Sequence, residues 1–146
     1  QLMFAKVFNR FPNQIPLEIQ QQILTFAALQ LGIKVELINA YQRRRQTISE
    51  HQQQIRGYLG LASFDKVAIG RICSFLFVEA QRIEHKSILL SKVEQFLKEQ
   101  NILQPARYTL ERLITTQRER ARRFIYDKML VHLTEIYKHN KIPAVV

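Results

Sequence analysis

Apolar residues recur at helical spacing along nearly the whole chain, and few helix-breaking residues interrupt them. Only four Gly and four Pro occur among 146 residues. Because Gly and Pro are the strongest local terminators of regular structure, their scarcity leaves long segments that can be helical. The sequence therefore predicts an all-α fold of about seven helices. It is expected to contain one or two helix-turn-helix-like units and a long, basic C-terminal helix.

The predicted helices form two subdomains, 1–62 and 63–146. Pro16 fits the first turn of a helix because that position needs no N–H group, and Gly32 suits a helix end. Ser63, Phe64 and Asp65 can cap a later helix. The helices expected from the apolar spacing cover approximately residues 1–9, 16–31, 35–42, 48–59, 65–81, 87–101 and 109–138.

Each predicted helix has apolar residues that would face a core. In the helix near residues 65–81 they lie nearly all round, so this helix should be buried. The inward residues expected from the spacing are Leu17, Ile23, Leu24, Ala27, Leu31, Ile48, Ile55, Leu59, Val67, Ile69, Ile72, Phe75, Leu76, Val78, Ile88, Leu89, Val93, Phe96, Leu97, Leu110, Leu113, Ile114, Ala121, Phe124 and Ile125.

Positive charge is concentrated in two segments of the chain. The formal net charge is +10, from 22 Lys and Arg against 12 Asp and Glu. Residues 41–60 hold four cations against Glu50 alone, and residues 107–128 hold seven cations against three acids. Clustered charge of one sign attracts phosphate and releases its counterions, whereas dispersed charge only solvates a surface. The clustering favours a nucleic-acid ligand over the alternative of a basic but inert surface.

The segment 41–64 has the layout of a DNA-recognition element. A run of three arginines precedes Thr47 and Glu50, which have the spacing of a capping box. The box predicts a helix that begins just after Thr47 and is stabilised there by about 1 kcal/mol. Together with the preceding predicted helix, 35–42, this gives a helix, a tight polar turn and a second helix. That order is the outline of a helix-turn-helix unit.

One face of this predicted helix has side chains suited to DNA bases. At 100° per residue, Ile48, Ile55 and Leu59 share an inward stripe, and polar residues occupy a neighbouring stripe. Arg pairs with guanine and Gln with adenine in the major groove, while Arg also binds phosphate. The residues expected to contact bases are Ser49, Gln53 and Arg56, and those expected to contact the DNA backbone are Arg43, Arg44 and Arg45.

The long C-terminal helix predicts a second DNA-contacting surface. Arg112 and Arg123 fall almost opposite its apolar stripe, and other arginines flank that stripe. A second helix-turn-helix unit could extend over residues 87–123. The residues expected to contact the DNA backbone from this surface are Arg107, Arg112, Arg118, Arg120, Arg122 and Arg123.

Four separated blocks of the chain occur in the order of a known pattern. They are RFPNQIP at 10–16, QLGI at 30–33, ILQPARYTLERL at 102–113, and, in order, Tyr41, Arg45, Thr47, His51, Ile55, Gly60 and Phe64. Together these blocks resemble the N-terminal region of transposases from the Tn-three family of replicative (class II) transposons. The chain departs from the family pattern at Ile48, where the family often has Arg, and it lacks a Trp that is usual in the following helix.

The resemblance implies a bacterial, cytoplasmic DNA-binding domain that recognises the terminal inverted repeats of a transposon during DNA transposition. Its partners would be double-stranded DNA and the catalytic remainder of the parent transposase, and a homodimer of the full-length protein is left open. In this family an Asp, Asp and Glu triad holds two divalent ions for attack on DNA. The main alternative is a helical protein-interaction or oligomerisation module with only non-specific nucleic-acid affinity. RNA binding is a third class.

No catalytic constellation is apparent in the sequence. Asp65 and Asp127 are the only aspartates, and no His is followed by Arg three residues later, as a tyrosine recombinase would require. His132 and His139 could share a helix face, but two His ligands rarely fix a metal. We therefore expect a non-enzymatic fragment without metal or cofactor. Cys73 is the single cysteine, and the lack of an apolar run of about 20 residues argues against a membrane partner.

Overall fold

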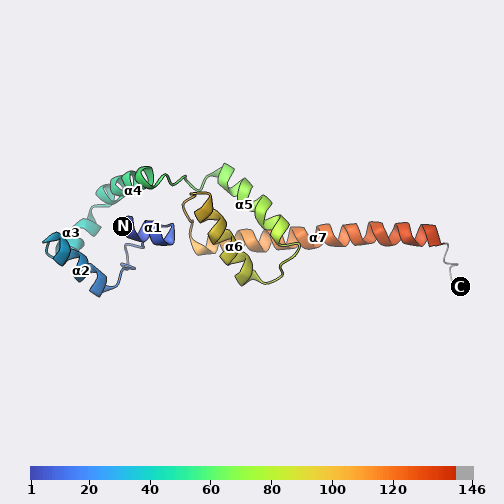
Figure 1. The fold of residues 1–146 in the computed structure, drawn as a ribbon, viewed down its shortest axis with the longest axis horizontal. Coiled ribbons are helices and arrows are strands. Elements are labelled where there is room, and N and C mark those ends of the chain that lie inside the picture. The colour runs from blue at the N-terminus through green and yellow to red at the C-terminus, as the bar shows by residue number, and fades with distance from the viewer. Residues whose placement is uncertain (141–146) are drawn as a thin grey trace. The chain divides into compact units, whose positions relative to one another are not determined.

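The all-α prediction is confirmed by the structure, a computed structural model that describes residues 1–140 except for the side chain of residue 39. Within these residues the chain forms seven α-helices and no sheet (Figure 1). The predicted long C-terminal helix is the last of them. The helices are α1 (Leu2–Phe8), α2 (Gln21–Leu31), α3 (Leu37–Arg43), α4 (Arg45–Leu59), α5 (Lys66–Glu79), α6 (Lys86–Glu99) and α7 (Arg107–Asn140).

The helices belong to two compact units. Unit 1 consists of Gln1–Ser63 together with Leu97–Gln104, and unit 2 consists of Phe64–Phe96 together with Pro105–Val146. Unit 1 therefore combines the start of the chain with a short segment from its second half. The segment includes the last turn of α6 and the connection that follows it.

A buried asparagine holds this segment to the start of the chain. Asn9 ends α1 in the left-handed conformation, with φ 54°, and is only 6% exposed. Its side-chain amide donates to the Ile102 carbonyl at 2.6 Å, and its own carbonyl accepts from the Gln104 N–H at 2.8 Å. Beside it, the Ala62 N–H donates to the Asn101 carbonyl at 2.7 Å. The bond from Asn9 to Ile102 satisfies buried polar groups that would otherwise be costly, and the three bonds together hold both segments in unit 1.

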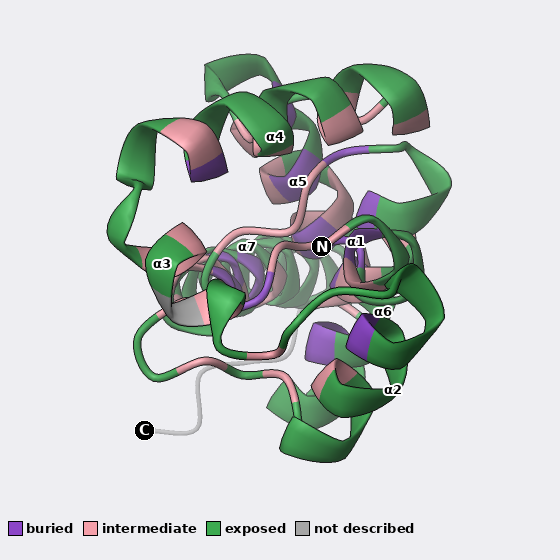
Figure 2. Ribbon diagram, turned by 90° about the vertical axis from the view of Figure 1, so that its left-hand side faces the viewer, coloured by how far each residue is buried: buried purple, intermediate pink, exposed green. Residues whose placement is uncertain are grey.

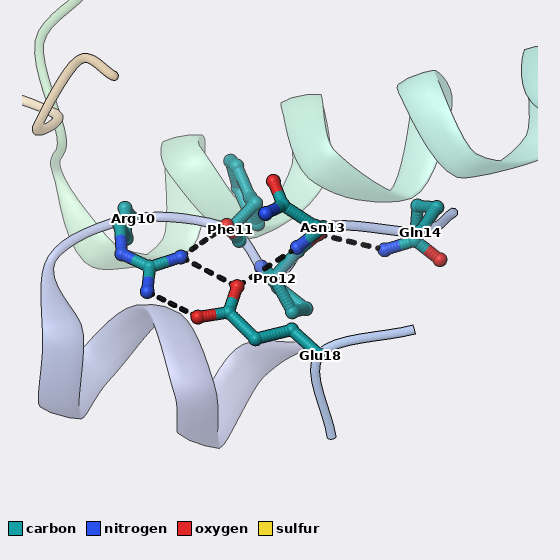
Figure 3. Close-up of polar contacts among 6 residues, drawn as sticks. All are labelled: Arg10, Phe11, Pro12, Asn13, Gln14 and Glu18. Atoms are coloured by element: carbon teal, nitrogen blue, oxygen red, sulfur yellow. Dashed lines mark hydrogen bonds and ion pairs between the residues drawn. The ribbon is translucent and has the colours of Figure 1, made fainter. Parts of the chain in front are cut away.

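The loop after α1 is held by an ion pair (Figure 3). The Arg10 guanidinium donates to both carboxylate oxygens of Glu18, one of them at 2.7 Å, and the Asn13 N–H donates to Glu18 at 3.1 Å. The bond from Arg10 and then the bond from Asn13 lower the pKa of the Glu18 carboxyl from an ordinary 4.5 to about 2. The prediction that Pro16 begins a helix is wrong, because α2 begins at Gln21, after this loop.

The predicted inward face of α2 is also wrong. Most of α2 is exposed (Figure 2). Ile23 is 56% exposed and Leu31 is 71% exposed, Ala27 is exposed, and the buried residue is Ala28. Leu24 is half-buried, as Leu17 is before the helix. Apolar residues of α1 and α2 instead line an open groove of about 860 Å³. Periodicity identified an apolar face, but it could not show that other helices of unit 1 leave this face uncovered.

The helices α3 and α4 contact each other and are separated only by Arg44. The predicted start just after Thr47 is wrong, since α4 begins at Arg45 and no side chain caps it. A capping box requires its Thr to stand outside the helix, and here the backbone around Thr47 is already helical. Glu50 accepts instead from the Gln46 side chain at 3.0 Å. One non-helical residue thus replaces the predicted polar turn.

The inward stripe of α4 is confirmed. Ile48 is buried, and Ile55 and Leu59 are half-buried. The helix ends at Gly60, whose φ of 63° is a left-handed conformation that glycine adopts without a steric penalty.

Unit 2 is built around α5 and α7, which pack side by side (Figure 1). The Asp65 side chain caps α5, as predicted, by accepting from the Ala68 N–H at 2.9 Å. The rings of Phe75 and Phe96 stack with centroids 4.5 Å apart, which attaches α6 to α5. The buried apolar residues of this unit include Ile72, Leu76, Leu89, Leu90, Val93, Leu110, Ile114 and Ala121.

Four residues predicted to face inward in unit 2 are exposed. Val67 is 71% exposed and Val78 is 51% exposed, so α5 is buried on one side and not nearly all round. Ile88 is 46% exposed and Phe124 is 37% exposed. A three-helix unit covers only one face of each member, which is why an apolar residue off that face stays in contact with solvent. The start of α7 at Arg107 is two residues before the predicted Thr109.

Candidate nucleic-acid interface

The residues predicted to contact DNA bases meet on one wall of a surface hollow in unit 1. Ser49, Gln53 and Arg56 line this hollow, whose volume is about 700 Å³. Gln52 lines it as well and was missed by the sequence argument. At 100° per residue Gln52 falls between Arg56 and the inward stripe of α4, so the helical wheel did not assign it to the polar face. The remaining lining residues are Phe11, Gly57, Gly60, Leu61, Ala62 and Leu103.

Other residues that line the hollow come from distant parts of unit 1. Phe11 follows α1, and Leu103 belongs to the segment that the Asn9 side chain holds in place. The Leu103 N–H donates to the Ala62 carbonyl at 2.9 Å, which connects this segment to the end of α4. The hollow is therefore lined by a polar wall on α4 and by apolar residues that include Leu61 and Leu103, which we call its apolar wall. Among the described residues, no acidic side chain lines it.

Arg56 is held against the hollow and is not a freely mobile side chain. Its guanidinium donates to the Ser63 hydroxyl, and the residue is half-buried. The Nε atom of Arg56 is buried and has no hydrogen-bond partner among the described residues. A buried donor without an acceptor is unfavourable, so this placement of Arg56 carries an energetic cost.

The three consecutive arginines lie at the junction of α3 and α4. Arg43 ends α3, Arg44 forms the junction, and Arg45 begins α4. All three are exposed. Their guanidinium groups form no hydrogen bond or ion pair within the part of the chain that the structure describes. They therefore add unneutralised positive charge at the start of the helix that carries the hollow's polar wall.

Tyr41 and His51, which both match the transposase pattern, contact each other beside this junction. The Tyr41 hydroxyl and the His51 Nδ1 atom are 2.9 Å apart, and their rings stack with centroids separated by 5.5 Å. The Gln1 amide donates to the same hydroxyl at 2.9 Å, and burial raises the pKa of Tyr41. His51 thus bonds a side chain of α3. The contact fixes α3 against α4.

Three arginines of α7 bond to side chains of unit 2. Arg107 pairs with Glu111 at 2.9 Å. Arg122 pairs with Glu84 at 3.0 Å. Arg120 donates to Gln117 at 3.1 Å and lies over the Phe77 ring, 5.8 Å from its centroid. Because Arg107 and Arg122 are paired with acids, they contribute less unneutralised positive charge than the sequence suggested, whereas the partners of Arg120 are neutral.

Arg112 and Arg123 are exposed, as their position opposite the buried Leu110 and Ala121 predicted. Neither guanidinium forms a hydrogen bond or ion pair within residues 1–140. Arg118 is half-buried between these positions. The basic surface of α7 therefore centres on Arg112 and Arg123.

Groups that could bind a metal are scattered. Over residues 1–140 no three His, Cys, Asp or Glu side chains lie close enough together to hold an ion. His132 and His139 are exposed on α7, and the His139 Nδ1 atom lies 3.0 Å from the Glu135 carbonyl. Among the described helices, none combines the length and the apolar character that crossing a membrane requires.

Comparison with known proteins places the chain in a family. No curated protein matches it. A family model described as Domain of unknown function (DUF4158) matches residues 1–117. The match includes α1 to α6 and the first part of α7, and hence every residue that lines the hollow. Since the matched region is well over half of the chain, the protein belongs to the DUF4158 family.

Proposed function

We propose that the chain is a non-catalytic DNA-binding domain of a transposase and that it recognises the terminal inverted repeats of a transposon. One observation carries the proposal. Ser49, Gln53 and Arg56 converge on one hollow in unit 1. They do so on the helix that begins at the exposed arginines 43–45.

The chemistry of the hollow suits the edges of base pairs. Gln53 and its neighbour Gln52 offer the paired donor and acceptor that adenine requires, and Arg56 offers the donors that guanine requires. The apolar wall formed by Leu61 and Leu103 can contact a thymine methyl group. Phosphate contacts from the arginine run would set the position of α4 on the duplex, and the hollow would supply sequence preference.

A second contact surface on α7 would lengthen the DNA footprint. Arg112 and Arg123 are the two exposed cations of α7 that face away from its packed side. Each phosphate that such a residue neutralises adds affinity without sequence preference. With two separated surfaces on one chain, the free-energy costs of mismatched DNA at the two surfaces would be roughly additive.

The resemblance to Tn-three family transposases supports transposon ends as the target. Catalysis would then come from an acidic triad elsewhere in the parent protein, and this domain would deliver the DNA ends to it. The fragment itself needs no metal or cofactor for binding. The parent protein is expected to act on DNA in the cytoplasm.

Selection of preferred sites from randomised duplexes, followed by binding measurements, tests the proposal. A selected site should recur, inverted, at both ends of the element that encodes the protein. Gln53→Ala should weaken binding to this site about 5- to 150-fold while sparing random duplex, because it removes a base contact. Arg44→Ala with Arg45→Ala should weaken binding to both duplexes and reduce the salt slope by about 2.

A matched charge-removal control is Arg82→Ala with Lys86→Ala, in exposed positions outside both basic segments. The salt slope of this control variant should equal that of the unmodified chain. Equal effects of the two double variants would show that the arginine run has no special role. If no site is enriched, and binding disappears at physiological salt, the alternative of an interaction module with non-specific affinity is favoured.

A further inference from the structure

The second half of α7 exposes an unusual amount of apolar surface. From Arg122 to Asn140 no residue is buried. This part of the helix extends beyond α5 in Figure 1. Six of its exposed apolar residues lie on one face of the helix, and we call them the α7 stripe. They are Tyr126, Met129, Leu130, Leu133, Ile136 and Tyr137, which are 64%, 53%, 62%, 57%, 40% and 53% exposed.

The α7 stripe is not an extension of the core of unit 2. At 100° per residue its six members span an arc of about 120°. The buried residues Leu110, Ile114 and Ala121 mark the side of α7 that packs on α5. That side is rotated by about 130° from the stripe. Helix α5 packs on a different side of α7, so even a longer α5 would leave the stripe uncovered.

Charge is arranged so that the stripe can meet a copy of itself. Residues 124–140 hold two acids and two lysines, whereas residues 107–123 hold six arginines and two glutamates. The side of the helix opposite the stripe carries the charges of the second half, including Lys128, which lies 4.6 Å from the Phe124 ring centroid. A chain of net charge +10 repels its copies almost everywhere, but this segment is formally neutral.

The position of the arginines sets the orientation of the pair. Arg112, Arg122 and Arg123 lie on the stripe's side of α7, just before the stripe begins. Parallel pairing would place the arginines of both copies against each other. Antiparallel pairing moves them to opposite ends of the interface and so avoids like-charge repulsion.

We propose that the α7 stripe pairs antiparallel with the stripe of a second copy and forms a twofold-symmetric dimer. The heptad spacing brings Met129 beside the partner's Leu133, and Tyr126 beside the partner's Ile136. Leu130 meets its own copy near the twofold axis. Each copy presents the same surface, so the contact closes on itself and does not propagate. The proposal concerns the chain alone and does not depend on DNA binding.

The size of the stripe predicts a reversible dimer. Burying a large apolar side chain removes roughly 60–120 Å² from water, so six on each copy remove about 700–1,400 Å² in total. Stable interfaces bury about 1,200–2,000 Å², which places this one at the low end of the range. We expect a dissociation constant in the micromolar range.

Sedimentation equilibrium of the complete 146-residue chain tests the dimer over a range from about 1 to 200 µM, chosen to bracket that constant. Met129→Lys with Leu133→Lys should raise the dissociation constant by more than about 100-fold, because it places charge in the centre of the interface. The matched control is Val131→Lys, a 60% exposed residue on the opposite side of the same helix, which should leave the dimer intact. Circular dichroism at 222 nm verifies that each variant is helical.

Three results would overturn the proposal. The parent chain could be monomeric throughout the range, or Val131→Lys could weaken the dimer as much as the stripe variant. Alternatively, Ile23→Lys, in the groove between α1 and α2, could abolish the dimer while the stripe variant kept it. In that case the groove would be the interface.

Cysteine cross-linking tests the orientation in a Cys73→Ser background. In an antiparallel pair, a mixture of Tyr126→Cys and Ile136→Cys chains should form a disulfide between unlike chains. Tyr126→Cys alone should not cross-link. Efficient cross-linking of Tyr126→Cys chains to one another would mean that the pair is parallel, and the antiparallel proposal would be wrong. A dimer that passes both tests but binds no preferred DNA site would refute the proposed function alone.

Discussion

The hydrogen bonds that join Asn9 to Ile102 and Gln104 are called the clasp below, because they hold segment 97–104 to the start of the chain. Replacing Asn9 tests whether the clasp determines the stability of unit 1. The Asn9→Ala variant loses the 2.6 Å bond to the carbonyl of Ile102, a residue that is 2% exposed. Leaving a buried acceptor unsatisfied costs about 1–3 kcal/mol. Ala also tolerates the observed φ of 54° less well than Asn, which adds about 1 kcal/mol. The expected loss of unfolding free energy is therefore about 2–4 kcal/mol.

The chain supplies a matched control at Asn101. This residue also has a positive φ, 51°, but its side chain is exposed and bonds to no described residue. Asn101→Ala should therefore show only the backbone term of about 1 kcal/mol. Asn9→Gly should show mainly the cost of the lost hydrogen bond to Ile102. Glycine adopts a positive φ without a steric penalty, so the backbone term stays small in this variant.

Urea denaturation followed by circular dichroism gives the three free-energy changes. Because the two units could unfold separately, amide hydrogen exchange should locate the change, with Ala62, Leu103 and Gln104 losing protection in Asn9→Ala. Equal destabilisation by Asn9→Ala and Asn101→Ala would refute the reasoning. It would mean that the buried hydrogen bond contributes nothing beyond the backbone conformation.

Two further outcomes are expected. Glu18→Gln should remove an acid-sensitive part of unit 1 stability: the folded-state pKa of about 2 is below the ordinary 4.5, so the contribution is complete above about 4.5 and disappears as pH falls toward 2. Urea titrations at pH 7 and pH 3 measure it, and an unchanged pH dependence in the variant would contradict it. Arg112→Ala with Arg123→Ala should reduce the salt slope of DNA binding by about 2, and an unchanged slope in a salt titration would remove α7 from the proposed interface.

Local sequence signals predicted those features that depend on residues close together in the chain. The cap at Asp65, the helix ends at Gly32 and Gly60, and the buried Ile48 are of this kind. The start of α4 was not predicted, although Thr47 and Glu50 have the right spacing. The cap is a local preference, and the helical backbone from Arg45 onward overrides it.

Long-range contacts account for most of the remaining differences. The bond from Asn9 to Ile102 joins residues 93 positions apart, and no local pattern announces it. The same limit applies to α2, whose apolar face is clear from the sequence although the structure leaves it exposed. A helical pattern fixes which side of a helix is apolar, but the partner that covers it is set by the rest of the fold.

The clasp and the hollow are physically linked, and this bears on how base recognition would depend on folding. The polar wall of the hollow is a single helix face, which α4 can present by itself. Leu103, on the apolar wall, stays in place only while segment 97–104 is bonded to Asn9 and Ala62. Loss of the clasp should therefore leave the arginine run on α3 and α4 intact and remove one wall of the hollow. If the domain binds DNA as proposed, binding to any duplex would then persist after the preference for one site is lost. Under that proposal, sequence discrimination would be the property most sensitive to the stability of unit 1.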